Sequence, residues 1–214
     1  MNNVAEPLTL AQQQLQRTID QCVGLVDSAL NDGQPVHELE GGIWRQLLRL
    51  GHDLLGSFFA RSGQGNMGET ITDPEGRELR RLDQPHAREY VSIFGTFELN
   101  RTVYGSREGQ KIEFVPLDNR LQLPASVYSY LLQDWSQGFC VESAFGQVSQ
   151  TLKRMLEVPV SVDGLERMNV AMAQRVDDYR EDRPRPAAET EGDIIVAFAN
   201  TQHPILLPNS TFGA

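Results

Sequence analysis

Four polar side chains near residue 170 have the chemistry to contact nucleic-acid bases. Arg, Asn and Gln form paired hydrogen bonds with guanine and adenine edges, and Arg also binds phosphate oxygens. The surrounding sequence predicts a helix over 162–179, because apolar residues recur every three or four positions and Ser161 can cap its start. Its apolar stripe comprises Val162, Leu165, Met168, Met172, Val176 and Tyr179, and its outward polar residues are Arg167, Asn169, Gln174 and Arg175.

A second amphipathic helix is predicted just before this one. Val158-Pro159-Val160 ends it, because a proline removes a backbone donor and disfavours helix at the preceding residue. Two such helices joined by a short turn are typical of a helix-turn-helix, whose second helix can enter the DNA major groove. A helical hairpin that only packs has the same spacing, so the pair alone does not establish DNA binding. The apolar face of the earlier helix comprises Ala144, Val148, Leu152 and Met155.

The charge of the chain restricts how it could bind DNA. Its formal net charge is -10, and an acidic surface repels phosphates, which supply most non-specific affinity. DNA binding therefore requires a local basic surface on an otherwise acidic protein. Glu and Asp are interspersed among the basic candidates, so a solvated face of mixed charge is the alternative. The candidates are Arg77, Arg80, Arg81, Arg88, Arg101, Lys153 and Arg154.

The first part of the chain is predicted to be a helical hairpin over 1–62. Apolar residues recur at helical spacing on both sides of Asn31-Asp32-Gly33, where the glycine suits a left-handed cap. Four glycines weaken the second helix, and we expect them to mark close packing against the first helix. These are Gly41, Gly42, Gly51 and Gly56.

Residues 63–123 are predicted to form one small antiparallel sheet of about four or five strands. Asp73-Pro74-Glu75-Gly76 is a turn sequence, a second strand pair surrounds Gly95, and a short strand is expected over 112–115. In the strand after Gly95, Arg101 falls on the mostly apolar face, where an arginine is expected to be paired or to extend toward solvent.

The remainder is predicted to be helical and then extended. Together with the hairpin and the sheet, these helices make the predicted fold class α+β. A helix-turn-helix-like domain spans 124–180, and its first helix, over 125–138, is expected to turn four apolar residues inward. A proline-rich charged linker follows over 181–192, and 193–214 holds one isolated strand of buried type. The inward residues are Val127, Tyr130, Leu131 and Trp135.

Composition indicates a cytoplasmic protein, since the sequence lacks a signal-peptide pattern and any apolar run that could span a bilayer. Cys22 and Cys140 are expected to be buried, reduced thiols, with a disulfide between them as the alternative. The histidines are scattered and stand beside no nucleophile or zinc-ligand pattern, so no cofactor or independent catalytic centre is expected.

Several runs, taken together, resemble the N-terminal part of bacterial insertion-sequence transposases of the ISKra group. The match runs in order from about Val36 to Ala199 and covers most of the chain. It implies a front half that recognises the ends of the element and a back half with an RNase-H-like catalytic domain. The runs that carry it are Leu79 to His86, Ser92 to Gly95, Arg101 to Gly105, Gln110 to Asp118, Leu131 to Trp135 and Ser161 to Met168.

The resemblance also implies that catalytic function is missing here. In such transposases the strand after the linker ends in the first of three metal-binding carboxylates, and Asn200 stands at that place. An amide lacks the anionic oxygen that Mg²⁺ prefers, so Mg²⁺ is expected only for an intact catalytic domain. The expectation is a truncated, catalytically inert fragment that binds terminal-repeat DNA and pairs with itself or with full-length transposase. The alternative is a dimerising, regulatory or non-functional remnant that associates with intact transposase without binding DNA.

Overall fold

The computed structural model describes residues 5–106, 111–174, 176 and 181–182. The fold is α+β, as expected. The strand predicted over 193–199, Asn200, Arg175 and nearly all of the predicted linker lie outside the described residues. Among the helices that the structure describes, none is both long and apolar enough to cross a membrane.

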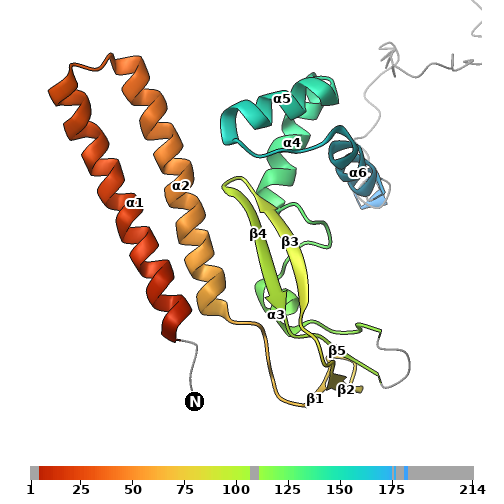
Figure 1. The fold of residues 1–214 in the computed structure, drawn as a ribbon. Coiled ribbons are helices and arrows are strands. Elements are labelled where there is room, and N and C mark those ends of the chain that lie inside the picture. The colour runs from red at the N-terminus through yellow and green to blue at the C-terminus, as the bar shows by residue number, and fades with distance from the viewer. Residues whose placement is uncertain (1–4, 107–110, 175, 177–180, 183–214) are drawn as a thin grey trace, which may run out of the picture. The chain divides into compact units, whose positions relative to one another are not determined.

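Two long antiparallel helices form the predicted N-terminal hairpin (Figure 1). Helix α1 spans Ala5–Asp32 and α2 spans Val36–Ser62. Gly33 joins them at a φ of +62°, the left-handed conformation that favours glycine. Between the helices, the Thr18 hydroxyl donates to the Asp53 carboxylate at 2.5 Å. The hairpin is therefore held by a polar contact as well as by packing.

The strands form two small sheets, so the prediction of a single sheet is wrong. Strands β1 (Thr70–Thr72), β2 (Glu78–Arg81) and β5 (Tyr104–Gly105) make one antiparallel sheet. Strands β3 (His86–Ser92) and β4 (Gly95–Arg101) make the other.

The chain changes sheets directly after β4. The Thr102 amide donates to the Gln64 carbonyl instead of continuing the ladder, and the Val103 carbonyl accepts from Leu82. The strand expected over 112–115 is reduced to a bridge between Phe114 and Tyr104, because Pro116 begins α3 (Pro116–Leu121).

Three helices complete the described part: α4 (Tyr130–Glu142), α5 (Phe145–Leu156) and α6 (Val162–Ala173). Helix α4 starts later than predicted, because backbone bonds from Val91 to Val127 and from Ser129 to Val91 hold the preceding residues extended beside β3. Ser129 then caps α4, and this start turns Leu132 and Ser136 inward. The prediction of the inward residues is wrong, because all four residues predicted to face inward are exposed: Val127, Tyr130, Leu131 and Trp135.

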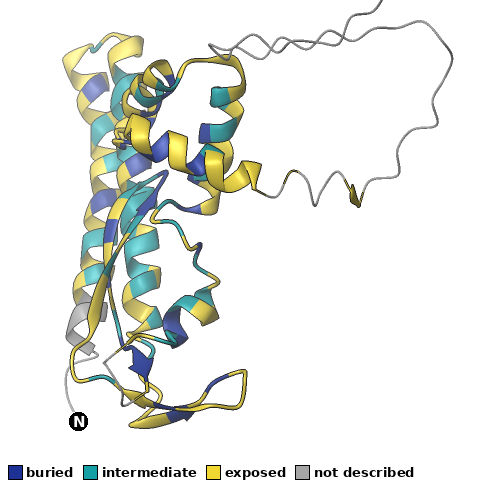
Figure 2. Ribbon diagram, turned by 90° about the vertical axis from the view of Figure 1, so that its right-hand side faces the viewer, coloured by how far each residue is buried: buried dark blue, intermediate teal, exposed yellow. Residues whose placement is uncertain are grey.

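One hydrophobic core joins helices and strands from three of the predicted segments. Leu48 of α2 packs with Val91 and Ile93 of the β3–β4 hairpin, and with a larger set from the C-terminal helices. Figure 2 draws these buried residues in dark blue. The helical members are Leu132, Val148, Leu152, Leu156, Leu165 and Met168.

The glycines of α2 face different neighbours. Gly42 lies against Leu25 of α1, where an added Cβ would be 3.1 Å from the leucine, as the close-packing prediction requires. Gly51 instead lies under the Phe94 ring at the turn of the β3–β4 hairpin, and Gly56 faces β4. The prediction that these glycines pack against the first helix is therefore right for Gly42 and wrong for Gly51 and Gly56.

The same Gly→Ala change should have opposite effects at two sites in the hairpin. An alanine at Gly51 would overlap the Phe94 ring, so Gly51→Ala should lower the free energy of unfolding by about 1 kcal/mol or more, despite better helix propensity. Gly24 of α1 has open space, so Gly24→Ala should raise it by about 1 kcal/mol. Urea denaturation measures both, and an equal sign for the two variants would contradict the contact.

Candidate nucleic-acid interface

Helix α6 begins as the sequence predicts. The Ser161 hydroxyl accepts a hydrogen bond from the Gly164 amide at 3.0 Å, and Asp163 lies in the first turn, where the helix dipole favours a carboxylate. Leu165 and Met168 are buried in the core shared with α4 and α5. These contacts fix which side of α6 faces outward.

The outward side of α6 is solvent-exposed and of mixed charge. Arg167, Gln174 and Val170 lie there beside Asp163 and Glu166, and all five are exposed. The two carboxylates were not among the predicted contact residues, although helical spacing places them on this face. The side combines hydrogen-bond donors, acceptors and an apolar surface.

Two of the predicted features of this helix differ in the structure. Asn169 is half-buried, and its amide nitrogen donates to the Leu165 carbonyl at 2.9 Å, so its donor is engaged within the helix. Of the predicted apolar stripe only Leu165 and Met168 are buried among the described residues, whereas Val162, Met172 and Val176 are exposed. Tyr179, its last predicted member, lies outside the described residues.

Lys153 and Arg154 lie in the last turn of α5 and are exposed. Cations at a helix C-terminus are favourable because they lie near the negative end of the dipole. Neither forms an ion pair with any residue that the structure describes. Their ammonium and guanidinium groups are therefore available to phosphates.

The buried face of α5 differs from the prediction at two of its four residues, because Ala144 is an exposed N-cap residue and Met155 is also exposed. Val148, Leu152 and Leu156 are buried, whereas Met155 is exposed. The Met155 carbonyl accepts a hydrogen bond from the Trp44 indole at 2.7 Å, which links α5 to α2.

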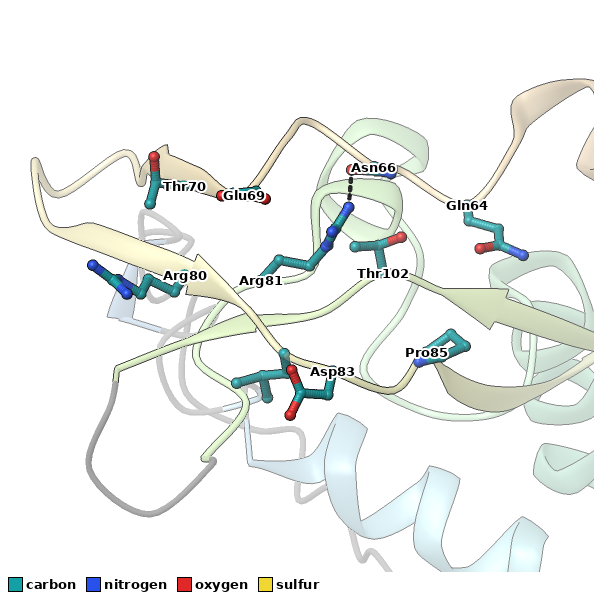
Figure 3. A pocket seen from close by; sticks show the side chains of 10 residues that line it. Gln64, Asn66, Glu69, Thr70, Arg80, Arg81, Asp83, Pro85 and Thr102 are labelled. Atoms are coloured by element: carbon teal, nitrogen blue, oxygen red, sulfur yellow. Dashed lines mark hydrogen bonds between the residues drawn. The ribbon is translucent and has the colours of Figure 1, made fainter. Parts of the chain in front are cut away.

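Arg80 and Arg81 of β2 line an open cleft of about 500 Å³ (Figure 3). Arg81 points toward Asn66 and donates to its side-chain oxygen at 3.3 Å, while Arg80 points away from Asn66. Successive strand residues face opposite sides, which accounts for the divergence. Glu69 and Asp83 also line the cleft, so its charge is mixed.

Arg88 and Arg101 are engaged inside the protein. Both guanidinium groups bind the same Asp118 oxygen, at 2.7 and 2.5 Å, and each arginine side chain is only 13% exposed. Arg88 also donates to the carbonyls of Pro124 and Ser126. The expectation that Arg101 is paired is confirmed, and this pairing leaves both arginines little capacity to contact DNA.

Arg77, another of the basic candidates, lies directly before β2 and is also paired. It binds Asp73 and Glu75 within the β1–β2 turn. Burial raises the pKa of the Asp73 carboxyl. Hydrogen bonds from the Arg77 backbone and guanidinium lower it by more than burial raises it, so the pKa lies below its usual value. The turn thus uses Arg77 as a structural cation.

The predicted contact residues therefore separate into groups. Arg80 and Arg81 share the cleft, Lys153 and Arg154 lie in the last turn of α5, and Arg167 lies on α6 with Gln174 at its C-cap; all six are exposed. Arg88 and Arg101 surround Asp118 instead. Comparisons with protein-family models, curated proteins and solved structures found no match.

Proposed function

We propose that this chain is a DNA-binding module that presents the outward side of α6 to the major groove. The observation that carries the proposal is the capped helix α6, which buries Leu165 and Met168 on one side and exposes Arg167, Val170 and Gln174 on the other. A helix held on one side and free on the other is what groove insertion requires.

The outward side of α6 offers a contact for each kind of base edge. Arg167 suits guanine, Gln174 suits adenine, Glu166 can accept from cytosine, and Val170 can contact the thymine methyl group. Lys153 and Arg154 at the end of α5 would supply phosphate contacts, and the Arg80–Arg81 cleft a second region of them. With Asp163 and Glu166 close by, we expect modest non-specific affinity and strong dependence on salt.

Within this proposal the chain is the end-recognising part of an insertion-sequence transposase of the kind that it resembles. The resemblance supports this assignment, and the exposed α6 face is compatible with it. Because Asn200 stands where that family has a catalytic carboxylate, we propose no strand-transfer activity for the chain itself.

Replacing Arg167 with alanine should weaken binding to a duplex from the terminal repeat that flanks the coding sequence. Loss of one good base contact costs about 1–3 kcal/mol, so the dissociation constant should rise roughly five- to 150-fold. Fluorescence anisotropy at several salt concentrations, with random duplex of equal length as competitor, measures this change.

Arg17→Ala is the matched control, because it removes the same charge from an exposed position on α1. It should leave the affinity within about twofold of the wild-type value, since a distant exposed charge is screened. Equal effects of the two substitutions, or equal binding to both duplexes, would contradict the role of α6. Association with another protein chain, in the absence of any DNA shift, would favour the alternative function.

A further inference from the structure

The α1–α2 hairpin carries an unusually extended apolar surface. On each helix most of the exposed apolar residues fall within an arc of roughly 60°, given 3.6 residues per turn; Leu10 of α1 and Trp44 of α2 are exposed outside these arcs. The residues within the arcs are 39–79% exposed. On α1 they are Ile19, Val23, Val26 and Leu30, and on α2 they are Val36, Ile43, Leu47, Leu54 and Phe58.

Both arcs lie on the same side of the hairpin. α1 contacts α2 through Thr18 and Leu25, and α2 contacts α1 through Gly42 and Asp53. In each helix the apolar arc is rotated from those contact residues by roughly 110° in the same sense. Because the helices are antiparallel, equal rotations direct the two arcs to one common side, which we call the hairpin face.

The hairpin face is large enough for a specific interface. Helices of 28 and 27 residues at 1.5 Å per residue are about 40 Å long, and two of them side by side are about 20 Å wide. The resulting area of roughly 800 Å² per copy is that of a standard protein interface and exceeds most apolar patches on monomers.

The order of residues along α2 is self-complementary in an antiparallel arrangement. Leu47 and Leu54 are equally far from the midpoint between Leu50 and Gly51, and so are Ile43 and Phe58. On the same side of α2, nearer its two ends, the exposed residues Glu40 and Arg61 are also equidistant from that midpoint. A second α2 running the opposite way would therefore place apolar residues on apolar residues and each Glu40 on an Arg61.

The register of the hairpin places α1 on the same axis. Thr18 bonds Asp53 and Leu25 packs on Gly42, so Ile19 lies at about the level of Leu50 and Gly51. A two-fold axis through this level, perpendicular to the helices, would bring the Ile19 side chains of two copies together. The same axis thus passes through the apolar arcs of both helices.

We propose that the hairpin face binds a second copy of this chain in antiparallel orientation, forming a four-helix dimer. Charge complementarity between Glu40 and Arg61 selects this occupant, because an identical chain presents the matching residue at the matching distance. The dimer does not depend on the proposed DNA binding, and either can fail alone.

Charge reversal tests both the partner and the orientation. Glu40→Arg and Arg61→Glu should each raise the dimer dissociation constant roughly tenfold, since each symmetric dimer would then hold two like-charged pairs. Mixing the two variants should restore near wild-type affinity as a heterodimer, in which all four side chains form opposite-charge pairs. Sedimentation equilibrium of the full chain measures the constants, with one variant labelled in the mixture.

Two further variants complete the test. Glu38→Arg makes the same charge change on the opposite side of α2 and should leave the constant unchanged, whereas Leu47→Glu should abolish the dimer without loss of helical circular dichroism. A wild-type chain that is monomeric at every concentration, or a dimer that Leu47→Glu leaves intact, overturns the proposal. Failure of the mixed variants to pair overturns the antiparallel orientation. Binding of a monomeric chain to anionic vesicles would also overturn the proposal, because it would identify lipid as the occupant of the hairpin face.

Discussion

Replacing Asp118 with alanine should lower the free energy of unfolding by about 3 kcal/mol, because it leaves two poorly exposed guanidinium groups without their counter-charge. Arg88 and Arg101 both bind one Asp118 oxygen, and the carboxylate is itself only 20% exposed. Arg88 further holds the carbonyls of Pro124 and Ser126, so the loss should also loosen the segment that leads into α4. Urea denaturation followed by circular dichroism measures the change.

Two comparisons separate charge from shape at this site. Asp118→Asn keeps an acceptor oxygen but removes the charge, so its cost should be smaller than that of alanine. Asp83→Ala removes a carboxylate from an exposed position and should change stability by no more than about 0.5 kcal/mol. If Asp118→Ala cost no more than Asp83→Ala, the two arginines would not depend on Asp118.

Leu152→Ala should destabilise the protein by about 2–5 kcal/mol, since a fully buried leucine leaves a cavity where its side chain was packed. Leu152 belongs to the core that also contains Leu165 and Met168 of α6. The substitution should therefore weaken the seating of α6 as well as global stability. Thermal and urea unfolding measure the stability, and amide exchange in α6 measures the local effect.

Met155→Ala is the control on the same helix. Its side chain is 43% exposed, so truncation should cost less than about 1 kcal/mol, and the hydrogen bond from Trp44 goes to its backbone carbonyl. Spacing alone assigned Met155 to the buried face. Equal losses from the two substitutions would favour that assignment over the one in the structure.

Features set by neighbours in sequence could be predicted from the residues. Gly33 ends the first helix, Ser161 caps α6, and Asp73-Pro74-Glu75-Gly76 turns the chain between β1 and β2, all as expected. Such caps and turns depend on φ preferences and hydrogen bonds within a few residues. The hairpin and the strand pair around Gly95 followed from periodicity in the same way.

Features set by distant contacts could not be predicted. Strand alternation placed Arg101 on an apolar face and so predicted a partner for it, but Asp118 lies far in sequence from both Arg88 and Arg101. Nothing local identified Asp118 as that partner or distinguished Arg88 from exposed arginines such as Arg80. Helix α4 buries Leu132 because backbone hydrogen bonds to Val91 of β3 fix where the helix begins. Periodicity predicts that a helix has an apolar side, but the neighbouring elements determine which residues that side contains.

A photoreactive residue on α6 tests the central claim most directly. With p-benzoylphenylalanine in place of Val170, which is 60% exposed on the outward side, irradiation should cross-link the chain to the terminal-repeat duplex. Unlabelled repeat should compete for the cross-link more strongly than random duplex. The same group at Val141 of α4, 84% exposed, should give little cross-linking; cross-links from Val141 equal to those from Val170, or none from Val170, would contradict the proposal.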